Sequence, residues 1–346
     1  MHILILGATG QIGYELSRVL SKEHTITIMI RGNRKNLAFP DAATLIESAS
    51  YDEEAMREAL EHSDLVVYAL GTPAQWLPDR NDFHVNNFLL LKRFLDVLIG
   101  TGVRTMVYIS TYELFKSIDG YIRESHPLTD APLHPYYESM LKSYVLMKEY
   151  EKRYDLQVIT MHPSAVYGGL NTGYGFTNYL CNLKDRRHRQ VPFLVGGSFP
   201  VVHVHSLASA VQSAIDRKRY GESYIISDQM TSLREMAHAL HRLYPKSMRP
   251  IQIPLFLVKL GTFFLDMYAD RVTRRPPIMT SVQIHYITRS PIPDTGKARA
   301  ELDFRPMILS AGIERWLRGD LPPGYIGSHL SRRLFREGAL VEVPHS

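Results

Sequence analysis

Three glycines near the N-terminus have the spacing of a turn that binds phosphate groups. Gly7, Gly10 and Gly13 follow one another at three-residue steps, after an apolar run at 3–6 and before a helical pattern at 14–20. Gly7 permits a tight turn, Gly10 lets the backbone approach a ligand, and Gly13 lets the helix pack closely on the strand. The free N–H groups at the helix start would then bind a pyrophosphate. An ordinary strand-to-helix turn is the alternative, and this placement favours the phosphate site.

A second chemical signal is a group of cations after the next expected strand. In a dinucleotide-binding fold, an acidic residue about 20 positions past the glycines binds the ribose hydroxyls of NAD. This chain has Arg31 at that place, with Arg34 and Lys35 nearby. Cationic side chains suit the 2′-phosphate of NADP. The sequence therefore favours NADP(H) over NAD(H), with a plain basic loop as the alternative.

These residues must be positioned by strands that alternate with helices. Apolar, β-branched runs predict the strands, and segments with a 3.6-residue period predict the helices between them. The alternation predicts an α/β fold of Rossmann type, a doubly wound parallel sheet with a smaller C-terminal substrate lobe. The expected strands of the first half are 3–6, 24–30, 44–47, 64–70 and 104–110, and the expected helices are 14–20, 52–62 and 83–99.

Hydroxyl side chains follow two of these strands. Ligands bind at the carboxyl ends of parallel strands, so Thr72, Ser110 and Thr111 are well placed for chemistry. The long helix at 83–99 is expected to pack against the sheet through one apolar face. Its inward residues are expected to be Val85, Phe88, Leu89, Leu95 and Leu98.

The second half of the chain is less regular and predicts a further lobe. The expected parts are a NAD(P)-binding Rossmann domain at 1–168, a strand and helix that return to it near 200–228, a mainly substrate-binding lobe at 169–321 and a peripheral tail at 322–346. The apolar stretch 251–269 contains Pro254, Lys259 and Asp266, which interrupt it too often for a membrane-spanning helix. We expect it to form a helix that lines the site rather than one that contacts a membrane.

Composition narrows the class further. The 346-residue chain has a net charge of +5 and one cysteine. Its basic clusters are scattered and lack interleaved aromatic residues, which favours solvated faces over a nucleic-acid interface. The cysteine count and an N-terminus without a secretory leader indicate a cytoplasmic protein. His203 and His205 alternate on an expected strand, but no third ligand has suitable spacing, so we expect no metal site.

Seven motifs, in order along residues 1–318, resemble the extended short-chain dehydrogenase/reductase family of NAD(P)-dependent epimerases, dehydratases and reductases. They are GATGQIG at Gly7, VNN at Val85, MVYIST at Met106, PYYES at Pro135, HPSAVYGG at His162, VHVHSLA at Val202 and DTGKARAELDFRP at Asp294. The cofactor residues implied by the resemblance and the two signals above are Gly7, Thr9, Gly10, Gln11, Ile12, Gly13, Arg31, Arg34, Leu70, Gly71, Tyr136, His162, Pro163 and Val166. The candidate substrate residues are Thr72, Tyr112, Glu113, Tyr174 and His203.

The resemblance also implies a catalytic group with one departure. In this family a hydride moves between nicotinamide and a carbinol carbon while a Tyr gives or takes the proton. The family's Asn matches Asn86, its Ser/Thr matches Thr111, its Tyr matches Tyr136, and its Lys falls on Met140. An unperturbed Tyr is only about 0.1% phenolate at pH 7 without a neighbouring cation. Tyr144–Lys148 has the same spacing, but it lies two turns further along and is interpreted as a chance match.

Other departures concern cofactor and lobe positions. Ala49 stands where the family often has an Asp, His162 where it has an Arg, and His205 with Ser206 where it has an Asp pair. The favoured function is an NADP-dependent oxidoreductase acting on a carbonyl or carbinol of a small organic or sugar-nucleotide substrate. A cofactor-binding sensor or regulator with a degenerate site is the alternative, because of Met140. A nucleotide-sugar epimerase or dehydratase is the third hypothesis. The resemblance also allows a homodimer through the helices at 83–99 and 136–154.

Overall fold

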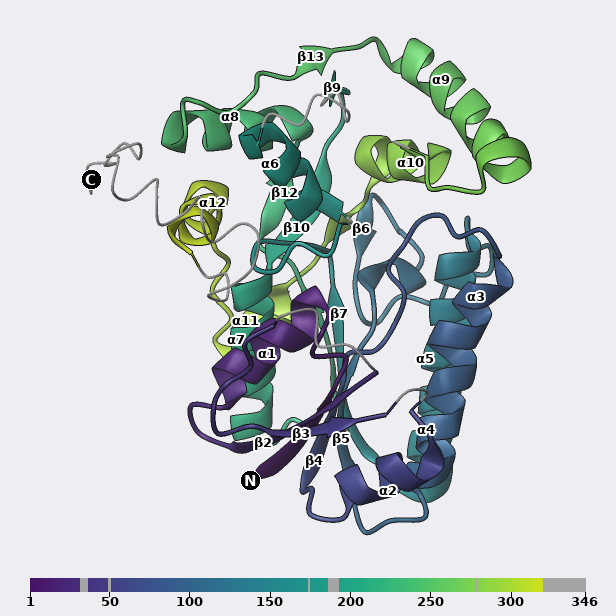
Figure 1. Cartoon of the computed structure of the whole chain (residues 1–346), viewed down its shortest axis with the longest axis vertical. Helices are drawn as coiled ribbons and strands as arrows, with labels where there is room; N and C mark the ends of the chain where they lie inside the picture. The colour runs from purple at the N-terminus through teal and green to yellow at the C-terminus, as the bar shows by residue number, and fades with distance from the viewer. Residues whose placement is uncertain (32–36, 49–50, 174, 186–192, 278, 320–346) are drawn as a thin grey trace.

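The computed structural model describes residues 1–31, 37–48, 51–173, 175–185, 193–277 and 279–319 (Figure 1). Its main layer is a seven-stranded sheet in the order β11-β7-β5-β4-β1-β2-β3. Every neighbouring pair in it is parallel, which confirms the predicted doubly wound Rossmann-type sheet. The strands are β1 (His2–Leu6), β2 (Thr25–Ile30), β3 (Thr44–Glu47), β4 (Leu65–Tyr68), β5 (Thr105–Ile109), β7 (Gln157–Pro163) and β11 (Ser223–Ile226).

Helices cover both faces of this sheet, and successive strand residues pack on opposite sides. Ile3 and Ile5 of β1 lie in one buried cluster with residues of α1, α7 and α11, whereas Leu4 and Leu6 lie in another with residues of α2, α4 and α5. Figure 1 shows the same two layers of helices. This burial on both faces explains why the strands read as apolar runs. The helices are α1 (Gln11–Leu20), α2 (Glu53–Leu60), α4 (Leu90–Leu98), α5 (Pro135–Tyr154), α7 (Val204–Asp216) and α11 (Gly296–Leu302).

A smaller lobe stands beyond the carboxyl ends of the strands (Figure 1). It contains a three-stranded sheet in the order β12-β10-β8 and two short strand pairs, β13-β9 and β14-β6. The strand near 200, β10, therefore joins this lobe, whereas helix α7 packs on the main sheet and strand β11 pairs with it. The remaining elements are β6 (Tyr121–Ile122), β8 (Ala165–Tyr167), α6 (Gly175–Asp185), β9 (Phe193–Leu194), β10 (Phe199–His203), β12 (Gln229–Thr231), α8 (Leu233–Leu243), β13 (Ile251–Gln252), α9 (Leu255–Tyr268), η3 (Ala269–Thr273), α10 (Ser281–Arg289), β14 (Ile292–Pro293) and α12 (Leu309–Arg318).

The helix predicted at 83–99 differs from its expected form. It begins as α3 (Asn81–Phe83), widens into the π-helix η1 (His84–Leu89) and continues as α4. The wider turn changes which side chains face the sheet. Leu95 and Leu98 are buried as predicted, but Val85 and Leu89 are exposed, and the prediction for these two was wrong. Leu91 and Phe94 are buried instead.

Two predictions for the second lobe are also wrong. β10 ends at His203 and α7 begins at the next residue, so His203 and His205 do not share a strand face. The apolar stretch at 251–269 does form a helix, α9, but most of its large apolar side chains point to solvent rather than into a site. Its buried residues are Val258 and Thr262.

Candidate dinucleotide and catalytic site

The glycine turn lies where the strand order reverses, between β1 and β4. Gly7 has a φ of +89°, and a Cβ there would lie 2.4 Å from the Ala69 carbonyl oxygen. A Cβ on Gly13 would lie 2.4 Å from the carbonyl oxygen of Gly7. Gly10 precedes α1 and offers no side chain to bond the first-turn N–H groups. These features fit a pyrophosphate bound at the helix N-terminus.

The residues around this turn have defined contacts. The Gln11 Nε2 group donates to the carbonyl oxygen of Gly168 at 2.6 Å and to Thr177 Oγ1 at 2.9 Å. Its amide therefore ties the turn to the smaller lobe. Ile12 packs against the core, and Thr9 is half-buried beside it in the turn.

The loop after β4 forms the other wall of this crevice and is held by an asparagine. Thr72 donates its backbone N–H to Asn87 Oδ1 at 2.7 Å, and Asn87 Nδ2 donates to Ser139 Oγ at 2.9 Å. Asn87 is buried, whereas Asn86 is only half-buried. Asn87, and not Asn86, is therefore the residue that holds this loop against α5. Leu70 and Gly71 precede Thr72 in the same loop, with Leu70 half-buried and Gly71 exposed.

The cationic position after β2 is only partly described. Arg31 directly follows β2 and is exposed at the carboxyl edge of the sheet. Arg34 and Ala49 lie outside the described residues. Among the described residues, Arg31 is therefore the cation placed to contact a 2′-phosphate.

Helix α5 positions Tyr136 in its first turn. Pro135 opens the helix, and His134 Nδ1 accepts the Tyr136 backbone N–H at 3.2 Å. Burial, followed by the charge of Glu113, raises the pKa of Tyr136 well above its usual value. A neutral phenol that donates a hydrogen bond is the form that this environment favours.

The side chain one turn after Tyr136 is apolar and packed. Met140 is buried in the cluster between the sheet and α5. Two nearby lysines of α5, Lys142 and Lys148, make other contacts. Lys142 pairs with Glu138 at 2.7 Å on the exposed side of α5, and Lys148 pairs with Glu151 at 2.7 Å. Tyr144 is buried against Phe115 and His162, as expected for a packing residue.

A hydroxyl and a carboxyl meet just after β5. Thr111 caps the short 3₁₀ turn η2 (Tyr112–Leu114), and its Oγ1 lies 3.5 Å from Glu113 Oε2. Burial raises the pKa of Glu113 to about 8, although hydrogen bonds with Tyr137 and Thr111 oppose this rise. This carboxyl can therefore gain or lose a proton near neutral pH.

Several predicted site residues lie inside the fold instead. Tyr112 is buried in the core of the smaller lobe, so its assignment to the substrate site was wrong. His162 is buried, donates from Nδ1 to the Thr111 carbonyl oxygen at 3.1 Å, and has its pKa lowered by burial to about 3. Pro163 ends the same strand, β7, and is buried, and Val166 is half-buried in β8. Tyr174 lies outside the described residues.

His203 is also a structural residue rather than a substrate ligand. It is fully buried, and its Nδ1 accepts the His205 backbone N–H at 3.2 Å to cap α7. A Cβ on Gly168 would lie 2.2 Å from His203 Nε2, and one on Gly312 would lie 3.2 Å from its Cδ2. The imidazole therefore fills a slot between two glycines.

Three further candidate site residues were not predicted from the sequence: Asn87, Ser139 and Tyr137. Asn87 had a usable signal, because positions 87, 91, 94 and 98 are spaced as one buried helix face, and all four are buried. The contact of Tyr137 with Glu113 depends on how α5 packs against η2, which no local pattern encodes.

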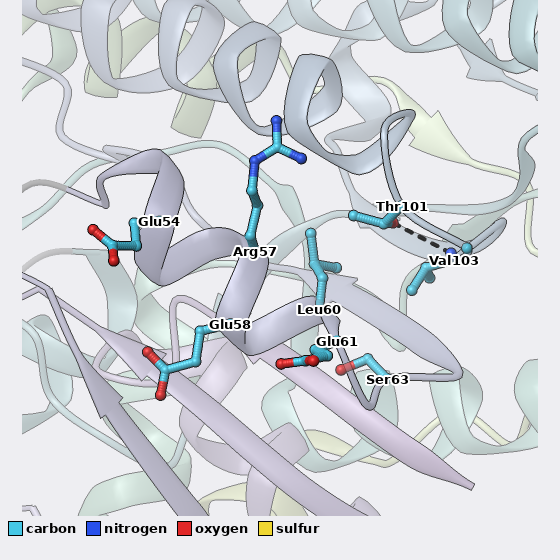
Figure 2. A pocket seen from close by; sticks show the side chains of 9 residues that line it. Glu54, Arg57, Glu58, Leu60, Glu61, Ser63, Thr101 and Val103 are labelled. Atoms are coloured by element: carbon cyan, nitrogen blue, oxygen red, sulfur yellow. Dashed lines mark hydrogen bonds between the residues drawn. The ribbon is translucent and has the colours of Figure 1, made fainter.

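An open depression of about 620 Å³ lies elsewhere, between α2 and the loop before β5 (Figure 2). It is lined by three glutamates, Glu54, Glu58 and Glu61, and by Arg57. It adjoins the amino ends of β4 and β5, opposite the edge that holds the glycine turn. It is therefore not part of the candidate site.

Among the residues that the structure describes, no three side chains of His, Cys, Asp or Glu come together as metal ligands would. No helix of those residues combines the length and apolar character needed to cross a bilayer.

Three features together define an extended short-chain dehydrogenase/reductase. They are the parallel sheet, the glycine turn, and the hydroxyl groups of Thr111 after β5 and Tyr136 at the start of α5. The sequence model of the NAD dependent epimerase/dehydratase family matches residues 3–227, and the chain belongs to this family. The class is therefore an enzyme class whose members use a nicotinamide cofactor.

The relatives differ in what they are named for. A dTDP-glucose 4,6-dehydratase of Mycobacterium tuberculosis is 26% identical over 265 residues, 70% of this chain and 78% of that protein. An uncharacterized protein of Sinorhizobium fredii is 25% identical, and the match spans 73% of this chain but only 63% of that protein. The structure of UDP-glucuronic acid 4-epimerase from Bacillus cereus, in complex with UDP-glucuronic acid and NAD, has a TM-score of 0.71 at 19% identity and covers 91% of this chain and 98% of that one. At that identity the likeness shows the fold.

Proposed function

We propose that the protein is an NADP-dependent enzyme that oxidises a carbinol or reduces a carbonyl in a small organic or sugar-nucleotide substrate. The bound nicotinamide supplies the site that accepts or gives the hydride. One observation supports the proposal most. The glycine turn lies at the same edge of the sheet as Thr111, Glu113 and Tyr136. All of these follow the carboxyl ends of β1 and β5 or begin α5.

The chain's own residues would divide the work as follows. Thr111 and Tyr136 hold the substrate oxygen by hydrogen bonds. Tyr136 remains a neutral donor, because burial and Glu113 raise its pKa and because Met140 supplies no charge. Glu113, with its pKa of about 8, takes or returns the proton through the Thr111 hydroxyl 3.5 Å away.

The cofactor preference rests on Arg31, which is exposed after β2 where NAD-specific folds place an acid. The test is calorimetric titration with NADPH and with NADH on the wild type and on Arg31→Glu. Arg57→Glu is the matched control, because Arg57 is an exposed cation at the opposite edge of the sheet. Tight NADPH binding that only Arg31→Glu abolishes would support the proposal. Equal binding of both nucleotides would contradict the proposed contact between Arg31 and the 2′-phosphate. Binding of neither nucleotide would refute the proposal that the protein uses a nicotinamide cofactor.

Turnover is tested next, and nucleotide sugars come first. The matched dehydratase and epimerase are named for dTDP-glucose and UDP-glucuronic acid. UDP- and dTDP-sugars should therefore be screened with the protein and either nucleotide. Epimerised or dehydrated product without net NADPH consumption would favour the epimerase or dehydratase reaction over net oxidation or reduction.

A second candidate function is a cofactor-binding protein with little turnover, such as a sensor or regulator. The buried Met140 favours it, because the position one turn after Tyr136 carries no cation. Tight nucleotide binding together with no reaction across the screen would support this candidate. Activity that appears in Met140→Lys and disappears in Met140→Lys/Tyr136→Phe would show that only the missing charge silences the site.

A further inference from the structure

Helix α9 exposes a large apolar surface at the outer corner of the smaller lobe (Figure 1). Phe256 is 69% exposed, Phe263 62% and Leu260 55%, and all three lie on one helical stripe. The exposed large apolar residues of this segment, here called the α9 surface, are Phe256, Leu257, Leu260, Phe263, Phe264, Leu265, Met267, Tyr268 and Val272. An apolar patch of this extent marks an interaction surface on a folded protein.

Around the α9 surface, the basic side chains are exposed and the acidic side chains bind neighbouring groups of the protein. Lys259, Arg271 and Arg275 are exposed on or just after the helix. The two acids of the same segment are half-buried and are bound by neighbouring groups. Asp266 accepts the Ser281 backbone N–H at 2.9 Å, and Asp270 binds Trp76 Nε1 at 2.8 Å together with Arg80. The outward face of the segment therefore combines apolar side chains with cations.

This combination selects among the partners that could cover the surface. A second copy of the chain in a twofold dimer would bring together two faces that carry the same excess of positive charge. An anionic lipid surface would instead take the apolar side chains into the headgroup and acyl boundary and pair its phosphates with the cations. The helix has 14 residues, about 21 Å, which suits a helix lying in the plane of the interface.

We propose that the α9 surface binds reversibly to membranes that contain anionic lipids. Phe263 and Leu260 enter the apolar boundary of the bilayer. Arg271 and Arg275 contact its phosphate groups.

The experiment is co-sedimentation of the full chain with vesicles of phosphatidylcholine alone and of phosphatidylcholine mixed with phosphatidylglycerol. We expect binding to the mixed vesicles that weakens as salt rises. Leu260→Glu/Phe263→Glu should lower partitioning about tenfold or more, because two large side chains lose their apolar burial. Arg271→Gln/Arg275→Gln should lower it about fivefold for each arginine on the mixed vesicles only. Ile308→Glu is the control, because Ile308 is 65% exposed at the start of α12.

Two further measurements separate the outcomes. Phe263→Trp keeps the surface apolar, and its indole emission should shift to the blue with mixed vesicles. Thermal melting should show that the charged variants are folded. No sedimentation with either vesicle would overturn the proposal. So would a wild-type dimer in analytical ultracentrifugation that Leu260→Glu/Phe263→Glu converts to a monomer, because a second copy would then cover the surface.

Discussion

Replacing Glu113 by glutamine should change how the stability of the protein depends on pH. Burial raises the pKa of Glu113 from 4.5 to about 8, so the folded chain keeps this proton at pH values where the unfolded chain has released it. Rising pH therefore favours the unfolded state. The contribution of Glu113 to stability is fully present below pH 4.5 and is lost as pH rises through the folded-state pKa of about 8.

The size of the effect follows from the two pKa values. Each unit of difference is worth about 1.4 kcal/mol, so the whole loss is at most about 5 kcal/mol. About 2.5 kcal/mol of it falls between pH 5 and pH 7. Burial also raises the pKa of Asp228, to about 6, and this group contributes a loss of its own in both proteins. The difference between the wild type and Glu113→Gln isolates Glu113.

The assay is urea unfolding at a series of pH values between about 5 and 8. Glutamine keeps the size and hydrogen-bonding capacity of the side chain but does not titrate, so the variant should lose less stability than the wild type as pH rises. Glu138→Gln serves as the control, because its carboxylate is exposed on α5. A difference curve that is flat between pH 5 and pH 7.5 would show that Glu113 ionises as freely in the folded chain as in the unfolded one, and the reasoning from burial would fail.

Three further substitutions test the site. Gly13→Ala should cost about 1–3 kcal/mol of stability and abolish nucleotide binding, because its Cβ would overlap a backbone carbonyl, whereas Gly102→Ala has open space and should do neither, as melting and calorimetry would show. Asn87→Leu should lower stability by about 2–4 kcal/mol, because it leaves buried partners unpaired. Asn86→Leu should cost much less, and the reverse order in urea unfolding would restore the original assignment. Tyr136→Phe should lower kcat about 100-fold or more, and an unchanged kcat would remove Tyr136 from catalysis.

Local sequence patterns were sufficient to predict the sheet and the glycine turn, because the structure of each depends on neighbouring residues in the chain. The apolar runs predicted the parallel, doubly wound sheet because both of its faces are buried, and the glycine spacing predicted the tight turn, in which Gly7 has a positive φ. The helix at 83–99 was predicted in place, but its π-helical turn depends on tertiary contacts of η1 with α5, such as the Ser143 hydroxyl that donates to the Asn87 carbonyl oxygen at 3.1 Å. Because Asn86 and Asn87 are adjacent, the sequence alone could not decide which of the two faces the site.

Burial is the property that sequence described least well. Tyr112 and His203 have side chains that could bind a substrate, but packing encloses both. The opposite error occurred at α9, where apolarity suggested an inward helix and the fold exposes it. Hydrophobicity predicts that a segment seeks a partner without saying whether that partner is the same chain.

The slot around His203 has a consequence for recombining this protein with its relatives. Gly168 follows β8, His203 ends β10, and Gly312 lies in α12, so three distant segments meet at one imidazole. A Cβ at Gly312 would also lie 2.1 Å from the Tyr167 hydroxyl oxygen. Consider a chimera that takes α12 from a homologue with any larger residue at position 312. That residue would displace the Tyr167 ring and crowd the His203 imidazole, which caps α7. Crossovers between homologues should therefore keep these three positions from one parent.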